Sequence, residues 1–221
     1  MRTYHIAVAA VVAAAGVAGG WFPTRAVAAD ATIPGVKLKM SDATQPGGAR
    51  RRIVSTARDT GIAVPAAGSA GDPSINGGLL EVANTNGSGE STAITLPAGN
   101  WIPLGGDPVT GWRYKEVVAD PPTADYKIKV TLKQGYSSSV LRVAVKDDRG
   151  TVILYTLDEP TQGSIGVSLA TGDDRNCLDF GGIVVVDESA DLGDGVYRGK
   201  FVAKAAPAPA ACASPSGAFL D

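Results

Sequence analysis

The stretch IKVTLK, residues 128 to 133, alternates apolar and polar side chains. Ile128, Val130 and Leu132 point to one side of an extended chain, and the two lysines and the threonine between them point to the other. This period of two predicts a β-strand with one buried face and one solvated face. Half-solvated strands are typical of antiparallel sheets, because strands of parallel sheets are usually buried on both faces.

The same alternation recurs along the chain, with turn sequences between the alternating segments. It is found at 36–40, 141–146 and 165–170, while NTNGSG (84–89) and DLGDG (191–195) carry the residues that tight turns need. The 28 glycines and 14 prolines disfavour long helices. We therefore predict an all-β protein, an antiparallel β-sandwich or an open barrel of about ten short strands.

The N-terminus has the features of a signal peptide. Arg2 precedes an apolar run from Ile6 to Gly20, which has the length of a signal-peptide core and is short for a membrane span. The small residues Ala26, Val27 and Ala28 fit a cleavage site. We expect residues 1–28 to be removed and the mature chain to be secreted or periplasmic, with no membrane span.

The remaining chain is expected to form one β-domain and a tail. Residues 29–204 are assigned to the β-sandwich, and a faint internal likeness suggests two related halves, about 36–118 and 126–204. Residues 205–221 are rich in alanine and proline, a composition that favours extended conformations on the surface.

Composition excludes several functions. The only histidine, His5, leaves with the signal peptide, so a Ser-His-Asp triad and histidine metal sites cannot form in the mature chain. The mature chain has 18 basic and 22 acidic residues, and this net charge of −4 does not indicate nucleic acid or anionic lipid as a partner. The lysines at 127, 129 and 133 are interpreted as the solvated face of their strand.

The two cysteines, Cys177 and Cys212, are expected to pair. A signal peptide directs the chain to an oxidising compartment, and only one intramolecular disulfide is possible. A catalytic thiol at Cys177 is the alternative, but the mature chain has no histidine, and Asp179 would raise the pKa of the thiol. The disulfide would attach the Ala/Pro-rich tail to the domain.

Four acids lie close together in DESADLGDG (187–195). Oxygen ligands at this density could bind calcium, although the spacing differs from that of an EF-hand loop. The alternative, which we prefer, is an acidic and solvated turn between two strands. The four residues are Asp187, Glu188, Asp191 and Asp194.

Three aromatic residues, Trp101, Trp112 and Tyr114, lie within a short stretch of the chain. If they were exposed, they would make a stacking surface for a sugar or a peptide; if buried, they belong to the core with their polar tips hydrogen-bonded. The core interpretation is preferred.

Three blocks, GWRYK (111–115), NCLDFGG (176–182) and APAPAAC (206–212), follow the signal peptide in this order. In this respect the chain resembles a loose group of uncharacterised secreted bacterial proteins. The resemblance implies a β-rich secreted fold and a paired Cys177 and Cys212, and it brings no catalytic residues with it.

These observations favour a secreted, non-enzymatic binding or structural module whose partner is a glycan or another envelope protein. The first alternative is a carboxylate-dependent enzyme that processes polysaccharide, which would need two acids facing each other across a groove. The second alternative is a calcium-stabilised surface module.

Overall fold

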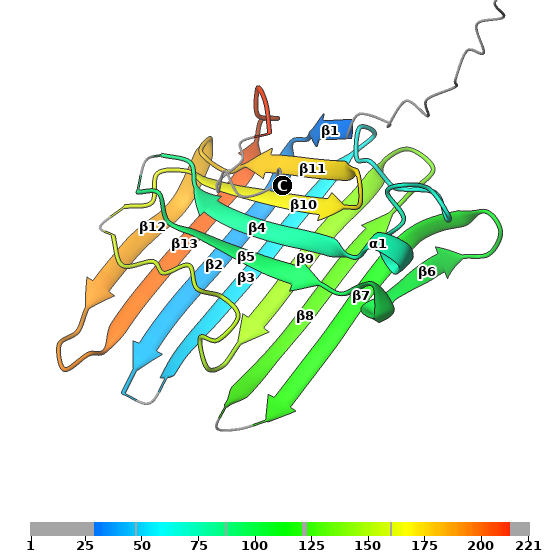
Figure 1. The fold of residues 1–221 in the computed structure, drawn as a ribbon. Coiled ribbons are helices and arrows are strands. Elements are labelled where there is room, and N and C mark those ends of the chain that lie inside the picture. Colours follow the sequence, from blue (N-terminus) through cyan, green and yellow to red (C-terminus); the bar gives the residue numbers. More distant parts are fainter. Residues whose placement is uncertain (1–28, 47, 87, 121–122, 160, 213–221) are drawn as a thin grey trace, which may run out of the picture.

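The computed structural model describes residues 29–212 of the chain, apart from 47, 87, 121–122 and 160. This part of the chain forms two β-sheets, stacked as two layers (Figure 1), and two short helical turns, α1 (Pro73–Asn76) and η1 (Ala98–Asn100). The strands in chain order are β1 (Ala29–Thr32), β2 (Gly35–Gln45), β3 (Gly48–Asp59), β4 (Gly78–Asn84), β5 (Ser91–Leu96), β6 (Trp101–Gly105), β7 (Val109–Asp120), β8 (Ala124–Lys133), β9 (Ser139–Asp147), β10 (Ile165–Thr171), β11 (Asp174–Asp179), β12 (Ile183–Asp191) and β13 (Tyr197–Ala206). The predicted all-β sandwich is confirmed, with thirteen strands in place of about ten.

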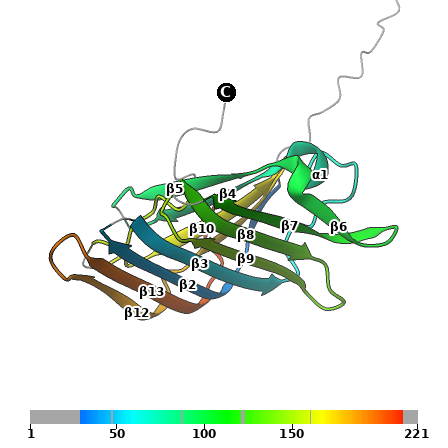
Figure 2. The ribbon, with the colours of Figure 1, turned by 90° about the horizontal axis from the view of Figure 1, so that it is seen from below.

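The larger sheet has eight strands in the order β12-β13-β2-β3-β9-β8-β7-β6, and all neighbours in it are antiparallel. The smaller sheet has five strands in the order β1-β11-β10-β4-β5. It is antiparallel except for β1 and β11, which are parallel. Figure 2 shows the smaller sheet covering one face of the larger sheet, so that the other face of the larger sheet is turned away from the sandwich.

The core lies between the two sheets and follows the alternation of the sequence. In β8, Ile128, Val130 and Leu132 are buried, whereas the lysines at 127, 129 and 133 are exposed. The same pattern in the neighbouring strands builds one continuous apolar cluster from both sheets. Burial of this apolar surface supplies the main driving force for folding.

The segments 36–118 and 126–204 do not form separate units. β2 and β3 pair with β13 and β9 in the larger sheet, and β4 pairs with β10 in the smaller one. Both sheets therefore take strands from both segments, and the whole domain is one sandwich. Between the two segments, β7 and β8 pair as neighbouring antiparallel strands as far as Asp120 and Ala124.

A long segment without regular structure, residues 148–164, joins β9 to β10 and lies over the inner face of the larger sheet (Figure 1). Its Ile153, Tyr155 and Leu157 are buried in the core. A Cβ atom on Gly199 of β13 would collide with Leu157, so the segment packs directly on that strand. It covers the part of the larger sheet that the smaller sheet leaves open.

The predicted chain ends fall partly outside the described residues. Residues 1–28, assigned to the signal peptide, and residues 213–221 of the tail are among those not described. β13 runs to Ala206, two residues beyond the boundary expected at 204. Within the described residues, no helix has the length and apolar character needed to cross a membrane.

Candidate functional site

The distribution of positive charge sets one surface of the molecule apart. In the described part of the chain, 15 of the 18 lysines and arginines are exposed on the outer face of the eight-stranded sheet, the face turned away from the smaller sheet. We call this surface the basic face. Its cations are Lys37 and Lys39 (β2), Arg50, Arg52 and Arg58 (β3), Arg113 and Lys115 (β7), Lys127, Lys129 and Lys133 (β8), Arg142 and Lys146 (β9), and Arg198, Lys200 and Lys204 (β13).

Strand alternation and register place these cations side by side. Residues paired directly across an antiparallel sheet point to the same face. Lys146 of β9 is paired with Arg52 of β3 on one side and with Lys127 of β8 on the other. Lys129 is paired with Lys115. Like charges are therefore direct neighbours at several positions, an arrangement that destabilises a sheet when no anion is bound.

Few of these charges are neutralised within the described residues. Lys146 forms an ion pair with Asp148, and Lys200 lies 3.9 Å from a carboxylate oxygen of Glu188. The other two ion pairs of the described chain, Arg51–Asp42 and Arg175–Asp30, involve arginines that are not on the basic face. Most of the basic face is thus free to attract an anion from solution.

The basic face also contains a hollow of about 380 Å³. Ala144 of β9 contributes the smallest side chain of its lining. Arg142 lies two residues before it and Lys146 two residues after it on the same strand. Arg52, Lys127 and Lys129 line it from the adjacent strands. A ring of cations around a small residue can hold an anionic group such as a phosphate or sulfate, because guanidinium and ammonium groups donate several hydrogen bonds to such oxygens.

The predicted aromatic residues belong to the core. Trp101, Trp112 and Tyr114 are 5 %, 1 % and 0 % exposed. The Trp112 indole N–H donates to the carbonyl oxygen of Pro65 at 2.8 Å, and the rings of Trp101 and Tyr114 meet edge to face with their centroids 5.2 Å apart. Burial raises the pKa of Tyr114 above its usual range. The alternative that these three rings form an exposed stacking surface is wrong, because the rings are buried.

The four acids of the proposed calcium site are not brought together. Asp187 and Asp191 are four residues apart on strand β12, about 13 Å in an extended chain, and Glu188 points to the opposite face. Asp187 accepts backbone N–H donors from Gln162 and Gly163 at 2.8–2.9 Å. Asp191 and Asp194 lie at the β12–β13 hairpin, where Asp191 accepts the N–H of Gly193. The hairpin is therefore an acidic turn, as the preferred interpretation predicts. The four acids do not form a calcium ligand set.

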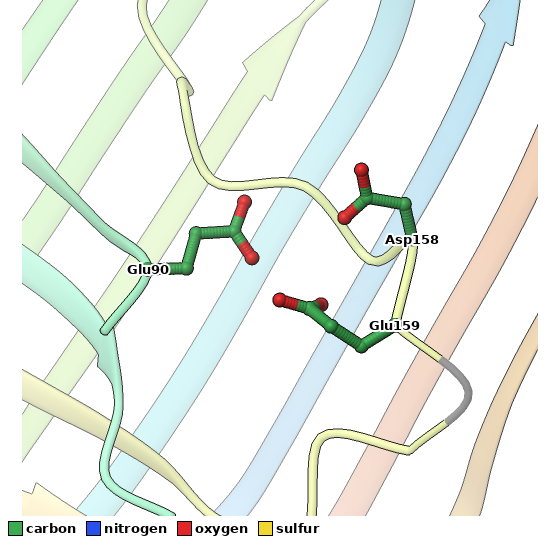
Figure 3. Close-up of side chains that lie close together, drawn as sticks. All are labelled: Glu90, Asp158 and Glu159. Atoms are coloured by element: carbon green, nitrogen blue, oxygen red, sulfur yellow. The ribbon is translucent and has the colours of Figure 1, made fainter. Parts of the chain in front are cut away.

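Another group of acids, which the sequence does not predict, does meet in the structure. Glu90 precedes β5, and Asp158 and Glu159 belong to segment 148–164, so residues far apart in sequence converge (Figure 3). Their carboxylate oxygens lie within 4.8 Å of one another, a geometry that could hold a metal ion. No local motif signals this group, because the cluster depends on how segment 148–164 crosses the sheet.

A proton can compensate part of the negative charge of this cluster. The Thr156 hydroxyl oxygen lies 2.5 Å from Glu90 Oε1 and 2.6 Å from Asp158 Oδ1, but a hydroxyl has one proton to donate. The hydroxyl can therefore donate to only one of the two carboxylates. Burial, together with the charges of Glu159 and Asp158, raises the pKa of Glu90 above its usual range. Glu90 Oε2 is buried without a hydrogen-bond partner, which is consistent with a carboxyl group that gains a proton readily.

The predicted disulfide is confirmed. Cys177 of β11 is bonded to Cys212, with the two Cα atoms 5.4 Å apart, and the described chain contains no free cysteine. Cys177 is buried, so the bond attaches the chain beyond β13 to the smaller sheet. The residue that first suggested a reactive thiol is a structural attachment point.

Comparison of the chain with known protein families, with curated proteins and with solved structures finds no match. The resemblance of the three sequence blocks to a group of secreted bacterial proteins therefore stays a prediction. Any statement on function rests on the arrangement of the residues themselves.

Proposed function

We propose that the protein is a secreted or periplasmic, non-enzymatic binding module that engages an anionic partner through the basic face. The observation that supports this proposal is the segregation of charge, with all the exposed lysines and arginines of the described chain on one side of one sheet. A surface of one charge sign raises the local concentration of its counter-charge and steers association.

The proposal changes one expectation from the sequence. A net charge of −4 for the mature chain argued against anionic partners, but net charge says nothing of where the charges lie. Of the acids in the described chain, Asp125, Asp148 and Glu188 lie at or beside the basic face, and the others belong to other parts of the molecule. A protein that is acidic as a whole can therefore present a strongly positive surface to a partner.

Two alternatives have less support. The polysaccharide-processing enzyme required acids in a groove beside Trp101 or Trp112, and both tryptophans are buried. The calcium-stabilised module was based on acids at 187–194, which point in different directions along a strand and its turn. A binding role for the basic face requires neither an exposed aromatic platform nor a catalytic pair.

The test is binding of inorganic polyphosphate, a polyanion without apolar groups, measured by titration calorimetry at low and high salt. The variant Lys127→Gln/Lys129→Gln/Arg142→Gln removes three charges around the hollow. Each cation near an anionic surface contributes about 1 kcal/mol, so we expect affinity to fall roughly 100-fold. Binding of the unchanged protein should weaken as salt is added, because salt screens exposed charges.

A matched control changes the net charge by the same amount elsewhere. Ser91, Ala93 and Thr95 are exposed on β5 of the smaller sheet, so Ser91→Glu/Ala93→Glu/Thr95→Glu also adds three units of negative charge. This control should retain most of the affinity. Equal loss in both variants would show that net charge alone governs binding, and no binding by the unchanged protein at low salt would refute the proposal.

A further inference from the structure

The cations of the basic face are spread over an area, and they do not follow a line. They occupy six adjacent strands, from β13 to β7, with a strand spacing of about 4.8 Å, so the array is about 24 Å wide. Outward-pointing side chains recur every two residues along a strand, a repeat of roughly 6.8 Å. In the direction of the strands, the cations extend over about four such repeats, from the position of Arg198 to that of Lys133. A linear polymer touches one path across such an array, whereas a planar anionic surface can approach many of the charges together.

Apolar side chains flank the array at its two sides. Ile102 of β6, Val117 of β7 and Ile183 of β12 are 54 %, 50 % and 59 % exposed. Each is paired with a cation of the basic face: Ile102 with Arg113, Val117 with Lys127, and Ile183 with Lys204. The register therefore places all three on the same face as the cations, where an isoleucine or valine gains nothing from contact with water or with a purely ionic polymer.

A positive centre with apolar margins matches the chemistry of a bilayer that contains anionic lipids. Phosphate headgroups attract the cations, and the boundary between headgroups and acyl chains accommodates exposed aliphatic side chains. We propose that the basic face docks the protein on an anionic lipid bilayer. This proposal rests on the proposed function of the same surface and names its partner.

The remaining charges give the docked protein one orientation. The three described arginines outside the basic face, Arg51, Arg149 and Arg175, are only partly exposed, and most of the described acids lie away from that face. Any other side of the molecule would bring acids toward the headgroups and be repelled. Docking on the basic face leaves the five-stranded sheet on the side away from the bilayer (Figure 2).

Nucleic acid is a less suitable partner for this surface. Proteins that bind single strands stack bases on exposed aromatic rings, and those that read duplexes insert an element into a groove. The outward-pointing residues of the six strands are mainly lysines, arginines and small or aliphatic residues, and none of those described within the strands is aromatic. The sheet also presents a broad surface with no projecting element at its centre.

The test is co-sedimentation of the full-length protein with vesicles of phosphatidylcholine alone or with one-third phosphatidylglycerol, with polyphosphate binding measured in parallel. We expect binding to the anionic vesicles and not to the neutral ones. The variant Ile102→Ser/Val117→Ser/Ile183→Ser should lose at least tenfold in vesicle affinity while its polyphosphate affinity stays within twofold. The variant Lys127→Gln/Lys129→Gln/Arg142→Gln should lose both, and the β5 control variant should lose neither.

The outcomes separate the two proposals. Binding of polyphosphate without binding of anionic vesicles would overturn the membrane proposal and leave the proposed function intact. Vesicle affinity that is unchanged in the Ile102→Ser/Val117→Ser/Ile183→Ser variant would also overturn it. These three apolar side chains are the feature of the surface that favours a bilayer over other polyanions. Failure to bind either probe would overturn both. Melting curves of each variant confirm that it is folded at the temperature of the measurement.

Discussion

Replacement of Asp147 by asparagine is expected to cost about 4 kcal/mol of folding free energy. Asp147 ends β9, is 0 % exposed and accepts four backbone N–H groups at the start of segment 148–164. Its Oδ1 accepts from Arg149 and Gly150 at 3.1 and 2.8 Å, and its Oδ2 accepts from Val152 and Ile153 at 2.7 and 2.9 Å. One side chain thus fixes the direction in which the segment leaves the sheet.

The magnitude follows from the number of donors that lose their acceptor. In the variant Asp147→Asn, one oxygen remains and can keep two of the four bonds. The amide NH₂ group then faces the other two N–H donors. Each donor left unsatisfied in a buried site costs about 1–3 kcal/mol, which gives a total of about 2–6 kcal/mol. For a chain of this size, 4 kcal/mol corresponds to a decrease in melting temperature of roughly 8–16 °C.

Urea unfolding followed by tryptophan fluorescence measures this loss. Asp148→Asn is the matched control, because it makes the same chemical change at the next residue, where the carboxylate pairs, among the described residues, only with the exposed Lys146. An exposed ion pair contributes about 0–1 kcal/mol, so the control should be nearly as stable as the unchanged protein. A loss below about 1 kcal/mol in Asp147→Asn, or an equal loss in both variants, would refute the reasoning.

Two further predictions concern the disulfide and the acidic cluster. Cys177→Ala/Cys212→Ala should reduce the free energy of unfolding by roughly 4 kcal/mol, the chain-entropy estimate for cysteines separated by 35 residues, and a change below about 1 kcal/mol in urea unfolding would contradict it. Glu90→Gln should increase stability at pH 7 by about 1 kcal/mol, because it removes the charge of a carboxylate whose Oε2 is buried without a hydrogen-bond partner. The raised pKa of Glu90 means that the folded protein binds more protons than the unfolded chain, so its stability falls as pH rises above the unfolded value of 4.5. The advantage of Glu90→Gln should therefore shrink as pH falls toward 4.5, and an advantage independent of pH would exclude this explanation.

The strands could be predicted because alternation is a local property. Ile128, Val130 and Leu132 are buried as their spacing indicates, and so are Leu141, Val143 and Val145. Segment 148–164 shows the limit of this signal. Ile153, Tyr155 and Leu157 also alternate with less buried residues, but the segment is held by side chains and not by a neighbouring strand. Alternation reports an extended chain with one buried side, whatever holds it there.

The basic face could be predicted only in part. Lys127 and Lys129 alternate with apolar residues, which indicates that both lysines point outward on their strand. It does not indicate that Arg52, 75 residues earlier than Lys127, lies two strands away across Lys146. Strand order is a non-local property, so a charge pattern that is ordinary within one strand becomes an extended positive surface only after the strands are assembled.

The adjacency of like charges on the basic face also makes the melting temperature a detector of ligands. Repulsion among neighbours such as Lys146 and Lys127 persists in the free folded protein and is relieved by any anion that occupies the surface. A partner present at 100 times its dissociation constant stabilises the folded state by about 2.7 kcal/mol, which is a shift of roughly 5–11 °C for a chain of this size. A thermal screen of anionic compounds and vesicles can therefore rank partners before any of them is known.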